Sequence, residues 1–77
     1  MVRITTPRGY AEVEAGAPFA ETVKRVADEK EVGARDSGGH RNFRVILGGT
    51  EIVDPEQAPA TIEEGAELVL FPFDKAG

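Results

Sequence analysis

Few residues of the chain belong to types that do chemistry. Three carboxylates gather near its C-terminal end, at Glu63, Glu64 and Glu67. A carboxylate pair works as acid and base when an apolar pocket raises the pKa of one partner. The polar sequence around these glutamates offers no such pocket, so we interpret them as part of a solvated turn.

His40 is the one histidine, and the chain has no cysteine. Without cysteine there are no disulfides, thiolate zinc sites or thiol nucleophiles, and no second ligand stands at metal-binding spacing from His40. The glycine pairs Gly38-Gly39 and Gly48-Gly49 fit neither of the common phosphate-binding patterns, and we interpret both as turns. We therefore expect no enzymatic activity, no metal and no cofactor.

Length and charge narrow the class of protein further. The 77 residues predict one domain, spanning 1–77, and nine basic against fourteen acidic residues give a net charge of −5. Such a charge disfavours binding to nucleic acid or to an anionic membrane. No apolar run approaches the ~18 residues that span a bilayer, and the first residues lack the pattern of a signal peptide, so we expect a cytoplasmic protein.

Hydrophobic periodicity predicts the elements of the first half of the chain. Alternation of apolar and polar residues indicates strands at 2–6 and 11–15, joined by a turn at 7–9. A helix is expected after Pro18, with Gly33 as its stop. Its buried stripe comprises Phe19, Val23, Val26 and Ala27.

The second half begins with a polar segment at 34–42, which we expect to be a mobile loop. Further strands and turns are predicted at the following ranges: a strand at 43–47, a glycine turn at 48–49, a short edge strand at 51–53, a proline-containing loop at 54–60 and a helical turn at 61–64. The strand that begins at Leu68 is apolar on both sides, which favours a central place in the sheet. The order predicts an α+β fold, in which one helix packs across a mixed sheet of four to five strands and the first and last strands run parallel at its centre.

Three stretches resemble the ubiquitin-like β-grasp family, which comprises ubiquitin, small archaeal and bacterial modifiers, and the sulfur carriers of molybdopterin synthase. They are T-V-K-R-V-A-D-E-K-E at 22–31, R-V-I-L-G-G-T-E-I at 44–52 and E-L-V-L-F-P-F-D-K-A-G at 67–77. The resemblance covers nearly the whole chain as a pattern, with few identities. It implies a β-grasp fold with residues 74–77 as a flexible tail.

The resemblance also implies a function and its partners. A separate ATP-dependent activating enzyme would adenylate the carboxylate of Gly77, which would then pass to a target protein or become a thiocarboxylate. Ala76 stands where the family has a glycine, and Phe73 stands where ubiquitin has an arginine. Asp74 adds a negative charge to the segment before Gly77, which is basic in ubiquitin. The activating enzyme would therefore differ from the one that activates ubiquitin. Lys24, expected to be partly packed, and Lys30 are possible acceptor lysines. We expect a monomer.

Ile46, Val69 and Phe71 are expected to form an outward apolar patch that binds partner proteins, with Arg44 beside them; the alternative is that one or two of them are simply half-buried. For the group Arg35, Arg41 and Arg44, a salt-bridged surface is favoured over a contact with an acidic partner.

The alternative function is a β-grasp interaction module or accessory subunit that never conjugates, which Ala76 and Asp74 favour.

Overall fold

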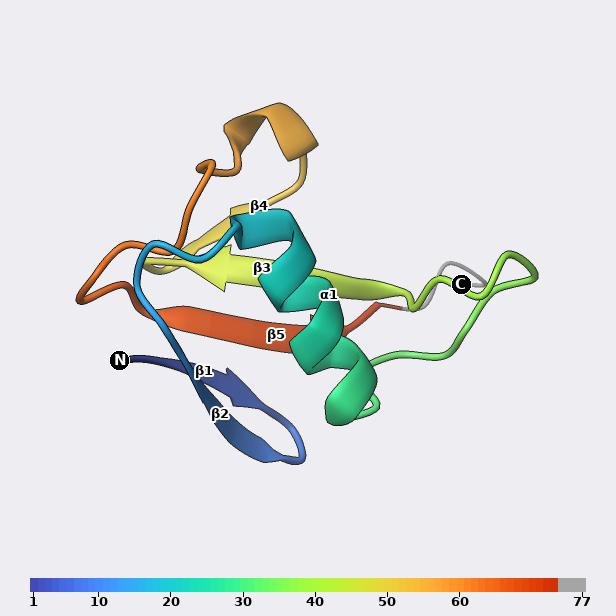
Figure 1. Ribbon diagram of the computed structural model, residues 1–77. Helices are drawn as coiled ribbons and strands as arrows, with labels where there is room; N and C mark the ends of the chain where they lie inside the picture. The colour runs from blue at the N-terminus through green and yellow to red at the C-terminus, as the bar shows by residue number, and fades with distance from the viewer. Residues whose placement is uncertain (74–77) are drawn as a thin grey trace.

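The computed structural model describes residues 1–73 and shows an α+β fold with a five-stranded mixed sheet and one helix. The helix, α1 (Phe19–Glu29), lies across one face of the sheet (Figure 1). The strands have the following bounds: β1 Val2–Thr6, β2 Gly9–Val13, β3 Phe43–Leu47, β4 Thr50–Ile52 and β5 Leu68–Pro72. Their order across the sheet is β2-β1-β5-β3-β4.

The strand with the most apolar sequence, β5, lies at the centre of the sheet. It pairs in parallel with β1, with Ile4 opposite Leu68, and antiparallel with β3, with Val45 opposite Leu70. This confirms the predicted central, parallel placement of the first and last strands. A central strand has a neighbour on both edges, and β5 pairs with β3 along its whole length and with β1 at Leu68 and Val69.

The core lies between α1 and the sheet face that it covers. The predicted helical stripe is buried as expected, together with Thr22. Alternate residues of the strands complete the core, which comprises Val2, Ile4, Val13, Val45, Leu68 and Leu70, joined by Val32 and Ile62 from the connections. Because strand side chains alternate between faces, their neighbours in sequence point to the side of the sheet that α1 leaves open.

Two hairpins flank the centre, and their turns have different chemistry. In the β1–β2 hairpin, the buried Thr6 hydroxyl donates to the carbonyl of Gly9 at 2.6 Å and accepts the backbone N–H of Arg8 at 3.2 Å. In the β3–β4 hairpin, Gly48 and Gly49 both have positive φ, +58° and +84°. Two consecutive positive φ angles define the type I′ turn, which suits the twist of paired strands and favours glycine.

The second strand and the edge strand begin earlier than predicted. Strand β2 covers 9–13 rather than 11–15, because Gly9 and Tyr10 pair with Thr6 and Thr5 while Ala15 lies exposed beyond the strand. Strand β4 covers 50–52 rather than 51–53, since the tight glycine turn lets Thr50 pair with Leu47 at once. Alternation of small apolar residues did not mark where pairing starts.

The helix also ends earlier than the predicted stop at Gly33. Lys30 is its C-terminal cap residue, and Glu31 takes a left-handed conformation with φ +51°. Gly33 is required for another reason: its φ is +82°, and a Cβ there would collide with the backbone carbonyl of Asn42. The glycine allows the segment after the helix to pass directly against the start of β3.

One of the predicted connections is different in the structure, and two others are loops as predicted. The helical turn predicted at 61–64 is absent, because Thr61 forms an isolated bridge with Pro18. A turn lies two residues later, at 63–66, where the N–H of Ala66 donates to the carbonyl of Glu63. The segment 34–42 is a loop, as predicted, and hydrogen bonds connect its parts. The backbones of Arg35 and Arg41 form an isolated antiparallel β-bridge. The Asp36 carboxylate accepts hydrogen bonds from the N–H groups of Gly38 and His40 at 2.9 and 3.0 Å. The loop predicted at 54–60 holds one short 3₁₀ turn, Pro55–Gln57.

Candidate functional site on the open face of the sheet

One row of side chains crosses all five strands on the face that α1 leaves open. Backbone pairing places its members side by side in the order Tyr10, Thr5, Val69, Ile46 and Glu51. Directly paired positions hold their side chains on the same face, within contact distance of one another. The row is therefore continuous from one edge of the sheet to the other, apolar in the middle and polar at both ends.

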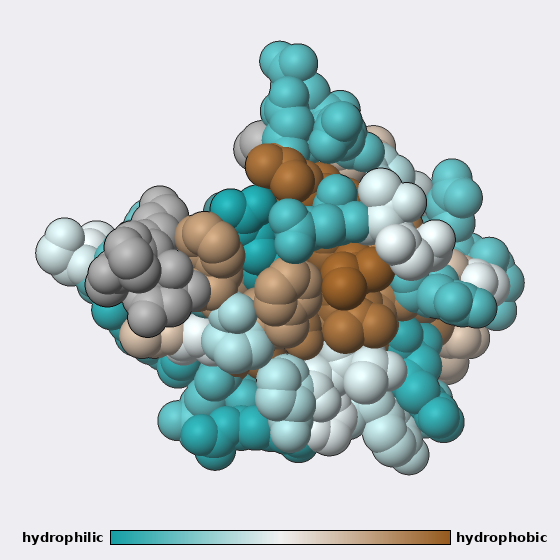
Figure 2. Space-filling model, turned by 180° about the vertical axis from the view of Figure 1, so that it is seen from behind, coloured by the Kyte–Doolittle hydropathy of each residue, from teal (hydrophilic) through white to brown (hydrophobic). Residues whose placement is uncertain are grey.

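The middle of this row and the next position along β5 form the apolar patch, defined as Ile46, Val69 and Phe71. Val69 has 36% of its surface exposed, and Ile46 and Phe71 are half-buried. Seen from behind the helix, the open face carries an apolar cluster at its centre with polar residues around it (Figure 2). The predicted patch thus exists as a surface, and the two interpretations weighed from the sequence both apply, since its members face outward while two are partly covered.

Arg44 lies beside the apolar patch and is held on two sides. It is paired in register with Phe71, and its guanidinium lies over the ring of Phe73, 4.0 Å from the ring centroid. Its Nη1 is 3.4 Å from Oε2 of Glu51, and 25% of its side chain is exposed. The arginine therefore joins the patch to the edge strand β4 and to the residue that follows β5.

A second arginine–aromatic pair lies toward the opposite edge of the same face. The guanidinium of Arg3 lies 4.1 Å from the ring centroid of Tyr10. Sequence reasoning missed Arg3, Tyr10 and Phe73 as members of this surface. Alternation in β1 and β5 would have placed Arg3 and Phe73 on it, but Tyr10 could not be found once β2 was predicted to begin at residue 11.

The structure brings together four of the residues predicted to form the site, namely Ile46, Val69, Phe71 and Arg44. The predicted reactive residues, Ala76 and Gly77, lie outside the described part of the chain. Lys24 is exposed on α1, contrary to the expected partial packing, and Lys30 is half-buried at the end of the helix. Both lysines belong to the helical layer and not to the open face.

The other two arginines of the basic group form salt bridges, as favoured from the sequence. Arg41 and Arg35 both bind Oδ1 of Asp28, at 2.9 and 2.8 Å, and Arg41 also donates to the carbonyl of Gly33 at 2.8 Å. The hydrogen bond from Arg41 lowers the pKa of Asp28 below its ordinary value, desolvation opposes this, and the positive charges of Arg35 and Arg41 lower it further. These contacts fasten the 34–42 loop to the helix.

The residues first considered for acid–base or metal chemistry lie apart from the patch. Glu63, Glu64 and Glu67 are all exposed, and Glu64 lies 3.6 Å from the N-terminal amine of Met1. His40 is exposed in the 34–42 loop. Within residues 1–73, no three histidine, aspartate or glutamate side chains gather closely enough to hold a metal ion.

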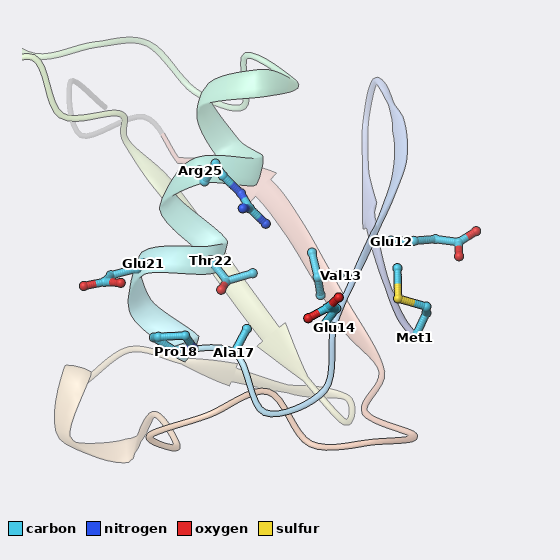
Figure 3. Close-up of a pocket in the computed structure, with 9 residues that line it drawn as sticks. All are labelled: Met1, Glu12, Val13, Glu14, Ala17, Pro18, Glu21, Thr22 and Arg25. Carbon is cyan, nitrogen blue, oxygen red and sulfur yellow. The ribbon is translucent and has the colours of Figure 1, made fainter.

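A groove of about 640 Å³ lies between β2 and α1, and its lining includes Glu12, Glu14, Glu21 and Arg25 (Figure 3). The close-up shows Glu12 and Glu21 on opposite sides of the groove, pointing away from each other. The groove therefore presents separate charges rather than a carboxylate pair, and none of the predicted site residues lines it.

No protein-family model matches the chain, and neither a curated protein nor a solved structure matches it. In the part of the chain that the structure describes, no helix is long and apolar enough to cross a membrane. The protein is thus an α+β protein with one helix on a five-stranded sheet, whose open face carries an apolar patch.

Proposed function

We propose that this protein is a ubiquitin-like β-grasp protein, which acts as a protein modifier or sulfur carrier through the carboxylate of Gly77. It is not itself an enzyme in this proposal, but a cytoplasmic, monomeric substrate of an ATP-dependent activating enzyme. The order of elements supports the β-grasp assignment: a hairpin, a helix, a second hairpin and a final strand inserted at the centre, parallel to the first.

One observation carries the functional part of the proposal. The central strand β5 contributes Val69 and Phe71 to the apolar patch and then leads directly into the last residues of the chain. A partner that docks on the patch is therefore next to the segment that carries Gly77. An exposed apolar cluster surrounded by polar side chains is typical of a protein–protein contact.

The chemistry assigned to Gly77 needs little from this protein beyond access. A carboxylate oxygen of Gly77 attacks the α-phosphorus of ATP in the activating enzyme, and pyrophosphate leaves. A sulfur donor or an amine then displaces AMP from the acyl-adenylate. Ala76 adds a Cβ next to the reacting residue, so the channel of the activating enzyme has to admit a side chain there.

An attachment assay tests this proposal. Protein tagged at its N-terminus is incubated with and without ATP in a lysate of its source organism, beside a variant that lacks Ala76 and Gly77. We expect ATP-dependent covalent adducts of the intact chain and none of the shortened chain. Ile46→Ala should lower adduct formation about ten-fold, the effect of losing about 1.4 kcal/mol of contact energy, while Glu29→Ala on the far side of α1 should not.

The alternative is a β-grasp interaction module that binds through the apolar patch without conjugation. The apolar patch supports the interaction module as well as it supports the carrier function, since either function needs a docking surface. The assay separates the two: the absence of ATP-dependent adducts of the intact chain would exclude the carrier function and leave the interaction module.

A further inference from the structure

The contact between Phe73 and β3 continues past the end of the β-sheet ladder. The last paired residues of β3 and β5 are Phe43 and Pro72. One residue later, the N–H of Phe73 still donates to the carbonyl of Asn42 at 3.0 Å. The chain is thus attached to the sheet through Phe73, although this residue lies outside the strand.

A side-chain contact on the open face reinforces this backbone bond. The guanidinium of Arg44 covers the ring of Phe73 at 4.0 Å from its centroid, and Glu51 on β4 binds the same guanidinium at 3.4 Å. Arginine stacks flat on aromatic rings, and a second partner that already orients it reduces the entropy lost in stacking. Arg44 and Phe73 also line one hollow of about 380 Å³.

We propose that Arg44 is a positioning residue, which together with Phe73 forms a bracket that fixes where the chain leaves the sheet. The bracket consists of the Arg44–Phe73 stack and the hydrogen bond from Phe73 to Asn42. It holds the chain on β3 through residue 73, beside the apolar patch, and makes the stacked pair part of the surface that a partner contacts.

The consequence for activation rests on the proposed function. A partner that takes hold of residue 77 has to dock within about 14 Å of Phe73, because each residue adds at most ~3.6 Å to the reach of the chain. The surface formed by Arg44, Phe71 and Phe73 lies within this reach, and we place the docking site of the activating enzyme there because the apolar patch adjoins it.

Amide hydrogen exchange of the isolated full chain, followed by NMR, tests the bracket without any partner or ATP. In Arg44→Ala, we expect the Phe73 amide to exchange about two- to five-fold faster than in the wild type, the range given by an exposed cation–π contact. The Leu70 amide should keep its rate, because the loss is local. The matched control is Arg3→Ala, which removes the equivalent stack on Tyr10 and should leave Phe73 unchanged.

An unchanged Phe73 rate in Arg44→Ala would overturn the bracket, as would equal acceleration of Phe73 and Leu70, which indicates general destabilisation. The role in activation is tested separately in the attachment assay, where Arg44→Ala should slow adduct formation several-fold relative to Glu29→Ala, a residue exposed on α1 and outside the open face. Equal rates of adduct formation would exclude the positioning role. Because the exchange experiment contains no activating enzyme, the bracket can be confirmed even where the proposed function fails.

Discussion

Ile46 and Val69 lie directly opposite each other on the antiparallel strands β3 and β5, on the face of the sheet that α1 leaves open. Their sequence neighbours Val45 and Leu70 form the equivalent pair on the covered face, where both are buried. The same two strands therefore build the core on one side and the apolar patch on the other. Side chains alternate between the two faces of a β-strand, so every second residue belongs to the core and the residues between them belong to the open face.

This division predicts different costs for neighbouring truncations in β5. Leu70→Ala should destabilise the fold by about 3 kcal/mol, since the side chain is fully buried and its removal leaves a cavity. Val69→Ala, with 36% of its surface already exposed, should cost under about 1 kcal/mol. Urea unfolding followed by circular dichroism measures both, and equal losses of stability would contradict the two-faced role of the strand.

The close approach at Gly33 predicts a position that tolerates no side chain. Gly33→Ala meets the Asn42 carbonyl and a left-handed backbone together, so we expect it to cost more than the ~1–2 kcal/mol of the backbone conformation alone. Gly39→Ala is the matched control, because Gly39 has the same φ of +82° and open space around it. Thermal unfolding of the two variants should rank Gly33→Ala as the less stable, and the reverse order would disprove the collision.

The Asp28 contacts predict a dependence of stability on acid. The pKa of Asp28 is lower in the folded state than in the unfolded chain, so its stabilisation is complete above the unfolded value of about 3.9 and is lost as the pH falls through the lowered folded value. Asp28→Asn should therefore melt below the wild type at pH 7, and the gap should close below about pH 3.9. Glu29→Gln, its exposed neighbour, serves as control; a gap that stays constant down to pH 2 would rule out this linkage.

The C-terminal segment predicts a further separation of stability from function. Deletion of Ala76 and Gly77 should leave the melting temperature almost unchanged while abolishing ATP-dependent attachment. Differential scanning calorimetry of the shortened and intact chains gives the first quantity. A large fall in melting temperature would mean that these residues pack against the fold, and would count against their use as a substrate.

Hydrophobic periodicity was sufficient to predict the elements whose faces differ most in polarity. The helical stripe from Phe19 to Ala27 is confirmed because α1 buries this face and exposes the other. The strand at 43–47 is confirmed with the same bounds, with Val45 buried and its neighbours half-buried. The start of β2 was missed, because Gly9 and Tyr10 are exposed and only backbone pairing makes them part of the strand. The turn expected at 61–64 failed because Thr61 pairs with Pro18, a contact between residues far apart in sequence.

The candidate site was predictable to the same extent. Alternation alone places Ile46, Val69 and Phe71 on one face, and the structure confirms that placement. The contacts of Arg44 with Phe73 and Glu51 could not be predicted, because they depend on side-chain conformations across three separate segments. From the sequence, Arg44 was interpreted by its charge, whereas in the structure it lies where the chain leaves the sheet.

Mass spectrometry of the C-terminal peptide tests the central proposal most directly. The intact protein is incubated with ATP in a lysate of its source organism, and the peptide that contains Gly77 is then sequenced. We expect a thiocarboxylate at Gly77 or a lysine-linked Gly77 remnant, formed only when ATP is present. A free and unaltered Ala76-Gly77 end under all conditions would contradict the carrier function and favour an interaction module that binds through Ile46, Val69 and Phe71.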